Sequence, residues 1–311
     1  MKRLPPSPQR GVALLLAVLL SALAALLAFA ILDSQAVALQ RTHAQMRGAQ
    51  LDEFARGVEA IASIALRRDQ GSQANLDHNG DVWHQPLVLE IPRGRLAARM
   101  RDLNGCFNLN SLADPNPALV TESLARLARL LVALELDPET ADAIADYVDA
   151  DQTPRDRGAE DLRYLGGRPA YRTADHPIAH VSELRAVAGV DAETYLRLSE
   201  ESCALASRAS INVNTASVAV LRSLHPSIDQ ARAAALAAEG NARHTGIEEF
   251  MLQVDQTGAQ RPDSLGLGVV SDEFLLESEI EYDGVTVAYW TRLSRSGGDV
   301  RIEARGRGRY R

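Results

Sequence analysis

The longest apolar run of the chain lies close to its beginning. Residues 12–32 read VALLLAVLLSALAALLAFAIL, in which Ser21 is the one clearly polar side chain. About 20 such residues are enough to cross the apolar core of a bilayer as a helix. Basic residues precede the run and Asp33 follows it. The positive-inside bias therefore predicts that residues 1–11 face the cytoplasm and that the rest of the chain lies outside.

The helical pattern continues beyond the apolar run. No proline occurs in residues 12–68, and apolar side chains recur in the second half of this stretch at spacings of three and four. They are Leu51, Phe54, Val58, Ile61 and Ala65. We therefore predict one long helix whose first half lies in lipid and whose second half packs on a folded domain through this face.

Two groups of short strand-like segments predict an antiparallel sheet. Asp283-Gly284, between two of them, is a strong hairpin signal. The residues between the two groups instead show several short amphipathic helices. The predicted strands are residues 86–92, 94–103, 274–282, 285–293 and 300–305. The pattern predicts an α+β fold in which a helical domain is inserted between strands.

Composition and motifs exclude several functions. The formal net charge of −8 is unfavourable for binding phosphate backbones, which requires clustered Lys and Arg. The two cysteines form no CxxC pair, so an ordinary structural zinc site is not expected. The chain contains no GxSxG, HExxH or P-loop motif, and its histidines are scattered. We predict that the protein is not an enzyme.

The junction before the apolar run has three interpretations. A removed secretory signal would need a shorter apolar core with a small-residue cleavage site after it. A plain signal anchor would be kept uncut. The third interpretation is a prepilin-type leader, which is cut before the apolar run, and Gly11 stands at that point directly behind Arg10.

The Arg10-Gly11 junction, the apolar run and the long helix resemble those of type IV pilins and type II secretion pseudopilins. The resemblance implies that a prepilin peptidase cuts after Gly11 and that Val12 becomes the N-terminus, which is then methylated. Most members of this group carry glutamate at the fifth mature position, where this chain has Leu16. That carboxylate meets the terminal amine of the subunit above it, and burying it unpaired would be costly. In lacking it, the chain resembles the minor pseudopilin K, the member placed at the fibre tip.

The order of strands and helices resembles the same family. The resemblance implies a pilin-like domain, with its long N-terminal helix and antiparallel sheet, and an inserted helical domain of SAM-like or helix-hairpin-helix-like type. The implied parts are a prepilin leader (1–11), a transmembrane helix (12–32), the first part of the pilin-like domain (33–112), the inserted helical domain (113–270) and the C-terminal strands of the pilin-like domain (271–311).

Residues 146–161, DYVDADQTPRDRGAED, form an acidic segment. Counted from Asp149 as in an EF-hand, Asp151 stands third and Glu160 twelfth, and hard oxygen ligands of this kind suit Ca²⁺. The sixth position is Pro154 instead of glycine, so a standard EF-hand turn is not expected. Two alternatives stay open, namely a solvated acidic face and neutralisation by the nearby arginines. Those arginines are Arg155, Arg157 and Arg163.

The resemblance to the K family implies calcium in the helical domain, which favours the metal. We therefore predict a Ca²⁺ site in this segment, to which backbone carbonyls and Glu183 are open as further ligands. The predicted ligands are Asp149, Asp151, Asp156, Glu160 and Asp161.

The two cysteines, Cys106 and Cys203, stand far apart in the chain. Thiols outside the cytoplasm tend to be oxidised, so we predict a disulfide that ties the insert to the sheet. Closing a loop of this length would stabilise the fold by roughly 4 kcal/mol in the chain-entropy model. The alternative is a pair of buried free thiols.

A weak repeat lies inside the predicted insert. Residues 180–198 resemble residues 214–236, and each reads as a helix, a short turn and a second helix, with Ser182 and Thr215 expected as caps. The sequence INVNTA (211–216) is also common in helix-hairpin-helix DNA-binding proteins, so a membrane-anchored DNA receptor is a rival function. The turns AGVD and HPSID lack the paired glycines and basic residues that hold phosphate. We therefore interpret the repeats as core-packing units and predict no nucleic-acid binding.

The resemblance implies a minor pseudopilin of the type II secretion system, which caps or initiates the tip of a periplasmic pseudopilus. It implies a single-pass protein of the bacterial inner membrane with its C-terminal domain in the periplasm. The implied partners are the minor pseudopilins of types I and J and the prepilin peptidase. The alternative is a minor pilin of a type IV pilus.

Overall fold

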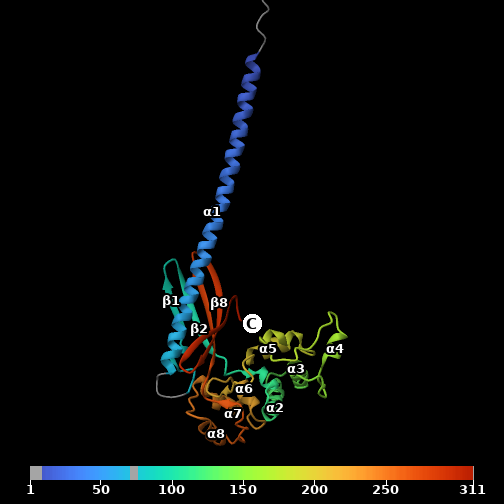
Figure 1. The fold of residues 1–311 in the computed structure, drawn as a ribbon. Helices are drawn as coiled ribbons and strands as arrows, with labels where there is room; N and C mark the ends of the chain where they lie inside the picture. The colour runs from blue at the N-terminus through green and yellow to red at the C-terminus, as the bar shows by residue number, and fades with distance from the viewer. Residues whose placement is uncertain (1–8, 71–75, 311) are drawn as a thin grey trace, which may run out of the picture. The chain divides into compact units, whose positions relative to one another are not determined.

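The computed structural model describes residues 9–70 and 76–310, so the predicted prepilin leader lies largely outside the described residues. The chain divides into two compact units, residues 1–54 and 55–311. Helix α1 (Gln9–Gln70) begins in the first unit and ends in the second, and its 62 residues confirm the long helix expected from the sequence (Figure 1).

The first unit consists of the greater part of α1. Its side chains from Val12 to Met46 are exposed, although most of those up to Leu32 are apolar. By length and composition this helix can cross a membrane. An exposed apolar surface of this extent is stable only if lipid or other helices cover it.

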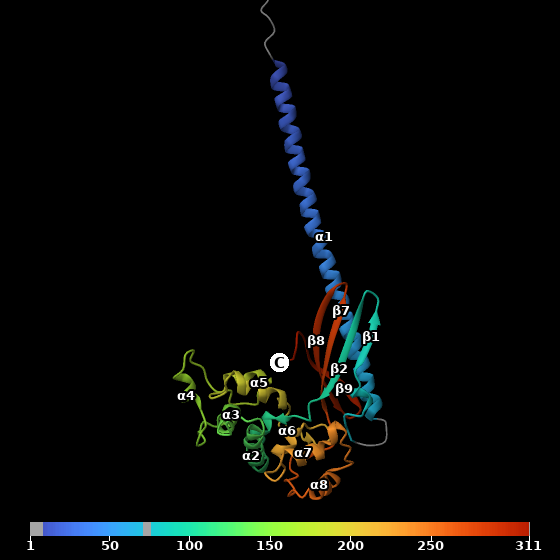
Figure 2. The same cartoon turned by 180° about the vertical axis from the view of Figure 1, so that it is seen from behind.

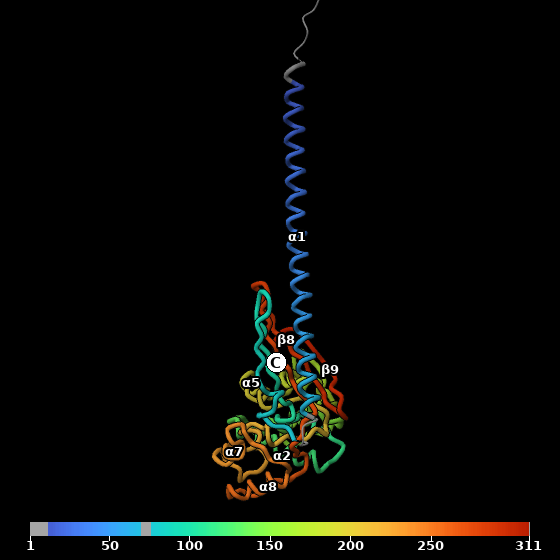
Figure 3. Tube along the Cα trace, turned by 90° about the vertical axis from the view of Figure 1, so that its left-hand side faces the viewer, coloured from blue at the N-terminus to red at the C-terminus, as the bar shows by residue number. Residues whose placement is uncertain are grey.

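The remainder of α1 packs on the sheet of the second unit (Figure 3). Ile61 is 45% exposed, whereas the buried side chains of this part are Ala55, Val58, Glu59, Ala62, Ser63 and Leu66. The prediction that Ile61 faces the core was therefore wrong. The buried positions recur at spacings of three and four and include alanines, which mark a buried face only weakly. Glu59 on this face accepts a hydrogen bond from Thr291 Oγ1 at 2.7 Å.

Five antiparallel strands form the sheet in the order β1-β2-β7-β8-β9. The predicted strands and the Asp283-Gly284 turn are confirmed. Strands β2 and β7 are neighbours although a long stretch of chain separates them, and Asp102 is paired with Phe274. The strands are β1 (Leu87–Ile91), β2 (Gly94–Asp102), β7 (Glu273–Tyr282), β8 (Val285–Ser296) and β9 (Asp299–Arg307).

A helical region lies between the end of β2 and the beginning of β7, at one end of the sheet (Figures 1 and 2). Its core consists mainly of aliphatic residues, together with two phenylalanines and three tyrosines. The α-helices are α2 (Pro117–Ala133), α3 (Thr140–Val148), α4 (Asp161–Leu165), α5 (Ala192–Glu201), α6 (Val218–Ser223), α7 (Gln230–Ala237) and α8 (Ile247–Gln256). The 3-10 helices of this region are η2 (Leu109–Ala113), η3 (Val181–Ala186) and η4 (Ala238–Gly240), whereas η1 (Val82–His84) lies before β1.

Two short parallel ladders within this region were not predicted. Strand β3 (Phe107–Asn108) pairs with β4 (Ser202–Cys203), and β5 (Ile211–Asn212) pairs with β6 (Leu267–Gly268). Two residues per strand are too few to show an alternating pattern in the sequence.

The weak sequence repeat corresponds to two pairs of helices, η3 with α5 and α6 with α7. The expected caps were wrong in both pairs. His180 caps η3 through its ring nitrogen, and Ser217 caps α6. Thr215 instead donates its hydroxyl hydrogen bond to Asp102.

Candidate functional site

The acidic segment folds into a loop between α3 and α4. Asp149 is the C-cap residue of α3, and Glu160 is the N-cap residue of α4. Asp149, Asp151 and Glu160 each place a carboxylate oxygen within 4.8 Å of the other two. The structure therefore brings together three of the five predicted calcium ligands.

Three carboxylate oxygens of this cluster are buried without hydrogen-bond donors. Glu160 is 6% exposed, and neither of its carboxylate oxygens has a hydrogen-bond partner among the described residues; the same is true of Asp149 Oδ1. Burial, followed by the charges of nearby acids, raises the pKa of Glu160 to about 7. Buried carboxylate oxygens without donors are what an oxygen-coordinated cation satisfies, so the residues fit Ca²⁺.

Arg155 supplies the positive charge that contacts the cluster. Its Nη1 lies 2.5 Å from Asp146 Oδ1 and 2.5 Å from Asp149 Oδ2, and its backbone N–H donates to Asp146 Oδ2 at 3.1 Å. Gly158 permits this packing, because a Cβ there would lie 1.7 Å from Asp146 Oδ2.

The other predicted ligands lie outside the cluster. Asp161 accepts hydrogen bonds from the backbone N–H and the hydroxyl of Thr173 at 3.1 and 3.0 Å. Asp156 is exposed. Glu183 accepts from the backbone N–H groups of Ala179 and His180 and so completes the cap of η3.

Two further acids affect the electrostatics of the cluster, and the sequence analysis missed both. The charges of Asp146 and Asp175 contribute to the raised pKa of Glu160. Asp146 is fully buried in α3, one helical turn before Asp149. This spacing from Asp149 was a signal that the sequence did offer. Asp175 lies far along the chain, and no local pattern connects it with the loop.

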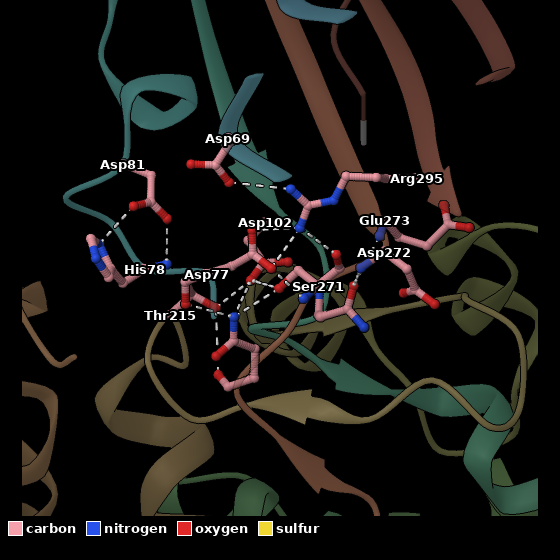
Figure 4. A network of polar contacts seen from close by, with 12 residues as sticks. Asp69, Asp77, His78, Asp81, Asp102, Thr215, Ser271, Asp272, Glu273 and Arg295 are labelled. Atoms are coloured by element: carbon pink, nitrogen blue, oxygen red, sulfur yellow. Dashed lines mark hydrogen bonds and ion pairs between the residues drawn. The ribbon is translucent and has the colours of Figure 1, made fainter. Parts of the chain in front are cut away.

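A second group of buried polar side chains lies where the helical region meets the sheet and the end of α1 (Figure 4). Arg295 on β8 is 7% exposed, and its Nη2 contacts both carboxylate oxygens of Asp77 at 2.5 and 2.6 Å. Its Nη1 lies 3.2 Å from Asp69 at the end of α1. Asp69, Asp77 and Asp81 bring their oxygens within 4.8 Å of one another, and Arg295 provides the compensating charge.

Asp102 is the second centre of this network. Its Oδ2 accepts hydrogen bonds from the hydroxyls of Ser271 and Thr215, both at 2.5 Å, and from Asn212 Nδ2 at 3.1 Å. Burial raises the pKa of Asp102 to about 6, although hydrogen bonds from Ser271, Thr215 and the Asn104 backbone oppose the shift.

The INVNTA segment contributes to the same junction. Asn212 is fully buried and donates to the backbone carbonyl of Asp77 at 3.0 Å, and Asn214 binds the backbone of His244 in both directions. These amides hold loops together inside the protein. Their placement supports the core-packing interpretation of the segment.

The structure joins Cys106 and Cys203 in a disulfide, with the two Cα atoms 5.9 Å apart. Cys106 follows β2 and Cys203 lies in β4, so the bridge links the exit from the sheet to the helical region. Leu205 and Leu275 are buried in the same small apolar cluster.

An apolar N-terminal helix that ends on an antiparallel sheet defines the class of pilin-like subunits, and the helical region inserted between β2 and β7 distinguishes this chain within the class. Comparisons with known proteins agree with this architecture. The family profile described as "Type II secretion system (T2SS), protein K" matches residues 105–207.

Curated relatives match nearly the whole chain. The type II secretion system protein K of Klebsiella pneumoniae is 32% identical, over 97% of each chain. That of Pseudomonas aeruginosa is also 32% identical, over 96% of this chain and 93% of the relative. The crystal structure of the GspK-GspI-GspJ complex from enterotoxigenic Escherichia coli contains a chain that superposes with a TM-score of 0.74 at 25% identity, covering 86% of this chain and 99% of that one.

The chain belongs to the type II secretion system protein K family. The protein is therefore a minor pseudopilin of type II secretion, and the expected fold class and family are confirmed.

Proposed function

We propose that this subunit assembles with minor pseudopilins of types I and J and caps or initiates the periplasmic pseudopilus at its tip. The related solved structure is a complex of three such subunits, and this chain covers 99% of the K subunit in it. The subunit acts through assembly and has no enzymatic activity.

The position of the helical region carries the tip assignment. Strand β2 ends and β7 begins at the end of the sheet where Asp69, near the end of α1, contacts Arg295. The inserted helices therefore occupy the space beyond the last turn of α1. In a fibre of stacked subunits the next subunit would need that space. This subunit can therefore have fibre neighbours only on the side opposite its helical region.

Leu16 supports the same assignment. A carboxylate at the fifth mature position serves to meet the amine of a subunit above it, and an unpaired carboxylate is costly in an apolar fibre core. In this chain the fifth mature position is Leu16, which carries no charge. A subunit at the tip has no subunit above it and therefore needs no carboxylate at this position.

Assembly tests the tip placement directly. Co-expressed with the I- and J-type subunits of its own system, the protein is expected to co-purify with both. In a cryo-electron microscopy map of the assembled pseudopilus it is expected at one end only. A map in which another pseudopilin is stacked beyond its helical region would overturn the proposal.

The subunit is held in the bacterial inner membrane by the apolar part of α1, with residues 55–311 in the periplasm. Its exposed apolar side chains from Val12 to Leu32 and the disulfide, which requires an oxidising compartment, support this location. A prepilin peptidase cuts the chain after Gly11, and Val12 becomes the methylated N-terminus.

Intact mass and N-terminal sequencing of the membrane-extracted protein test this maturation. The wild-type chain is expected to begin at Val12, and Gly11→Val is expected to block cleavage because the peptidase requires the glycine. Gly48→Val is the matched control, since its added Cβ meets nothing within 4 Å and it lies far from the junction. A chain that begins at Met1, or after residue 30, would contradict the leader.

The acidic loop binds Ca²⁺ through Asp149, Asp151 and Glu160. The donorless buried oxygens of Glu160 and Asp149 support this ligand set. The bound ion would neutralise carboxylates that otherwise repel one another between α3 and α4. Calcium thus has a structural role, in holding the loop of the helical region that faces away from the sheet.

A further inference from the structure

Arg155 lies in the acidic loop, where a bound cation would compete with its guanidinium for the carboxylate of Asp149. Its Nη1 bridges Asp146 Oδ1 and Asp149 Oδ2 at 2.5 Å each. Asp149 is also one of the three carboxylates that approach one another in the cluster. The same carboxylate therefore contacts the guanidinium through Oδ2 and is also a member of the cluster.

The charges on the two sides of Asp149 are unequal. Within the cluster, both carboxylate oxygens of Glu160 and Oδ1 of Asp149 are buried without donors. On the other side, Asp146 is fully buried and Arg155 is its ion-pair partner. The single positive charge of Arg155 is thus too small to balance the several carboxylates around it. The guanidinium is nevertheless close enough to Asp149 to repel a metal ion that binds there.

We propose that Arg155 is the counter-ion of the metal-free loop and that calcium displaces its guanidinium from Asp149. Because calcium must displace Arg155 in order to bind, Arg155 lowers the calcium affinity of this subunit. The inference rests on the calcium site proposed above. When the guanidinium leaves, Asp149 Oδ2 and Asp146 Oδ1 become available as oxygen donors. Asp146 Oδ2 keeps the backbone N–H of Arg155 at 3.1 Å, so the displacement leaves this buried acid with a partner.

This role predicts opposite effects of one substitution on two properties. Without metal, Arg155 stabilises the loop by pairing with Asp146 and Asp149, so its removal lowers the melting temperature. With metal, Arg155 repels the ion and occupies one of its ligands, so its removal tightens binding. A purely structural arginine would give a loss in both measurements.

The test uses the full-length protein extracted in detergent, with calorimetric titration of Ca²⁺ and thermal melts in chelator. Arg155→Gln is expected to bind Ca²⁺ at least about tenfold more tightly, the order expected for removing one charge near the ion at an effective dielectric constant of about 20. Its melting temperature in chelator is expected to fall. Arg155→Lys, which keeps the charge, is expected to retain an affinity close to that of the wild type.

Arg157→Gln is the matched control. It removes one positive charge from the same loop, but the Arg157 side chain is 65% exposed and contacts Glu139 at 3.4 Å, outside the cluster. It is expected to leave calcium affinity and melting temperature nearly unchanged.

The outcomes separate the two proposals. A wild-type protein that binds no Ca²⁺ overturns the calcium site and, with it, the role of Arg155. A wild-type protein that binds Ca²⁺, together with an Arg155→Gln variant that binds equally or more weakly, overturns the role of Arg155 alone. Tighter binding by Arg155→Gln with a lower melting temperature in chelator supports both.

Discussion

Arg295→Met is expected to lower the melting temperature of the periplasmic part by about 10 °C. The substitution leaves Asp77 buried without its ion-pair partner, and breaking a buried pair from one side typically costs 3–5 kcal/mol. Each kcal/mol corresponds to roughly 2–4 °C in a domain of this size. Circular dichroism melts of the full-length protein in detergent measure the change.

A second substitution separates the lost charge pair from lost packing. Arg295→Met combined with Asp77→Asn removes both charges of the pair. It is expected to recover part of the stability, because an uncharged amide is far less costly to bury than a carboxylate. The recovery is incomplete, since Asp69 still loses its contact with Arg295. Arg301→Met, on the exposed surface of β9, is the matched control and is expected to change the melting temperature little. An Arg295→Met protein as stable as the control would show that the pair contributes nothing.

Glu160→Gln is expected to abolish most of the stabilisation that calcium gives. A ligand at about 100 times its dissociation constant stabilises the folded state by about 2.7 kcal/mol, which corresponds to a rise of roughly 5–10 °C in melting temperature. The wild-type protein is expected to show such a rise between chelator and excess Ca²⁺. Glu160→Gln removes a buried charged ligand and should reduce the rise to a small fraction.

The same variant is expected to be no less stable than the wild type in chelator. Its uncharged amide avoids both the cost of burying a charge and the repulsion from nearby carboxylates, which in that order raise the pKa of Glu160 to about 7. Asp156→Asn is the matched control, because it removes one acid of the same segment that lies outside the cluster. If Glu160→Gln keeps the full calcium-dependent rise, Glu160 is not a ligand.

Periodic patterns allowed the fold to be predicted from the sequence. The helical pattern of α1, the alternation in residues 274–282 and the turn at Asp283-Gly284 are local signals, and the structure has a helix, a strand and a hairpin turn at these places. The face of α1 was misplaced at Ile61 because alanines carry part of the buried stripe, and a weakly apolar residue does not mark a face.

Less of the site could be predicted from the sequence, because its geometry depends on how segments that are distant in the sequence come together in the fold. The count from Asp149 to Glu160 found carboxylates that the loop does bring together, whereas Asp156 and Asp161 were included only for their charge and position. The buried pair of Asp77 and Arg295 joins residues more than 200 positions apart, and no pattern in either segment connects them. Arg155 was considered as an alternative to the metal, and the structure places it on the same carboxylate as the cluster.

The neighbouring positions of β2 and β7 bear on how this subunit could have arisen. Asp102 and Phe274 face each other across adjacent antiparallel strands, so the whole helical region leaves and re-enters the sheet at one point. A short turn between these two residues would complete a simple hairpin and leave a five-stranded sheet behind α1. Such a subunit has the outline of an ordinary fibre-forming relative. The helical region is therefore an addition to a single connection of the sheet, at a site where loop length costs little.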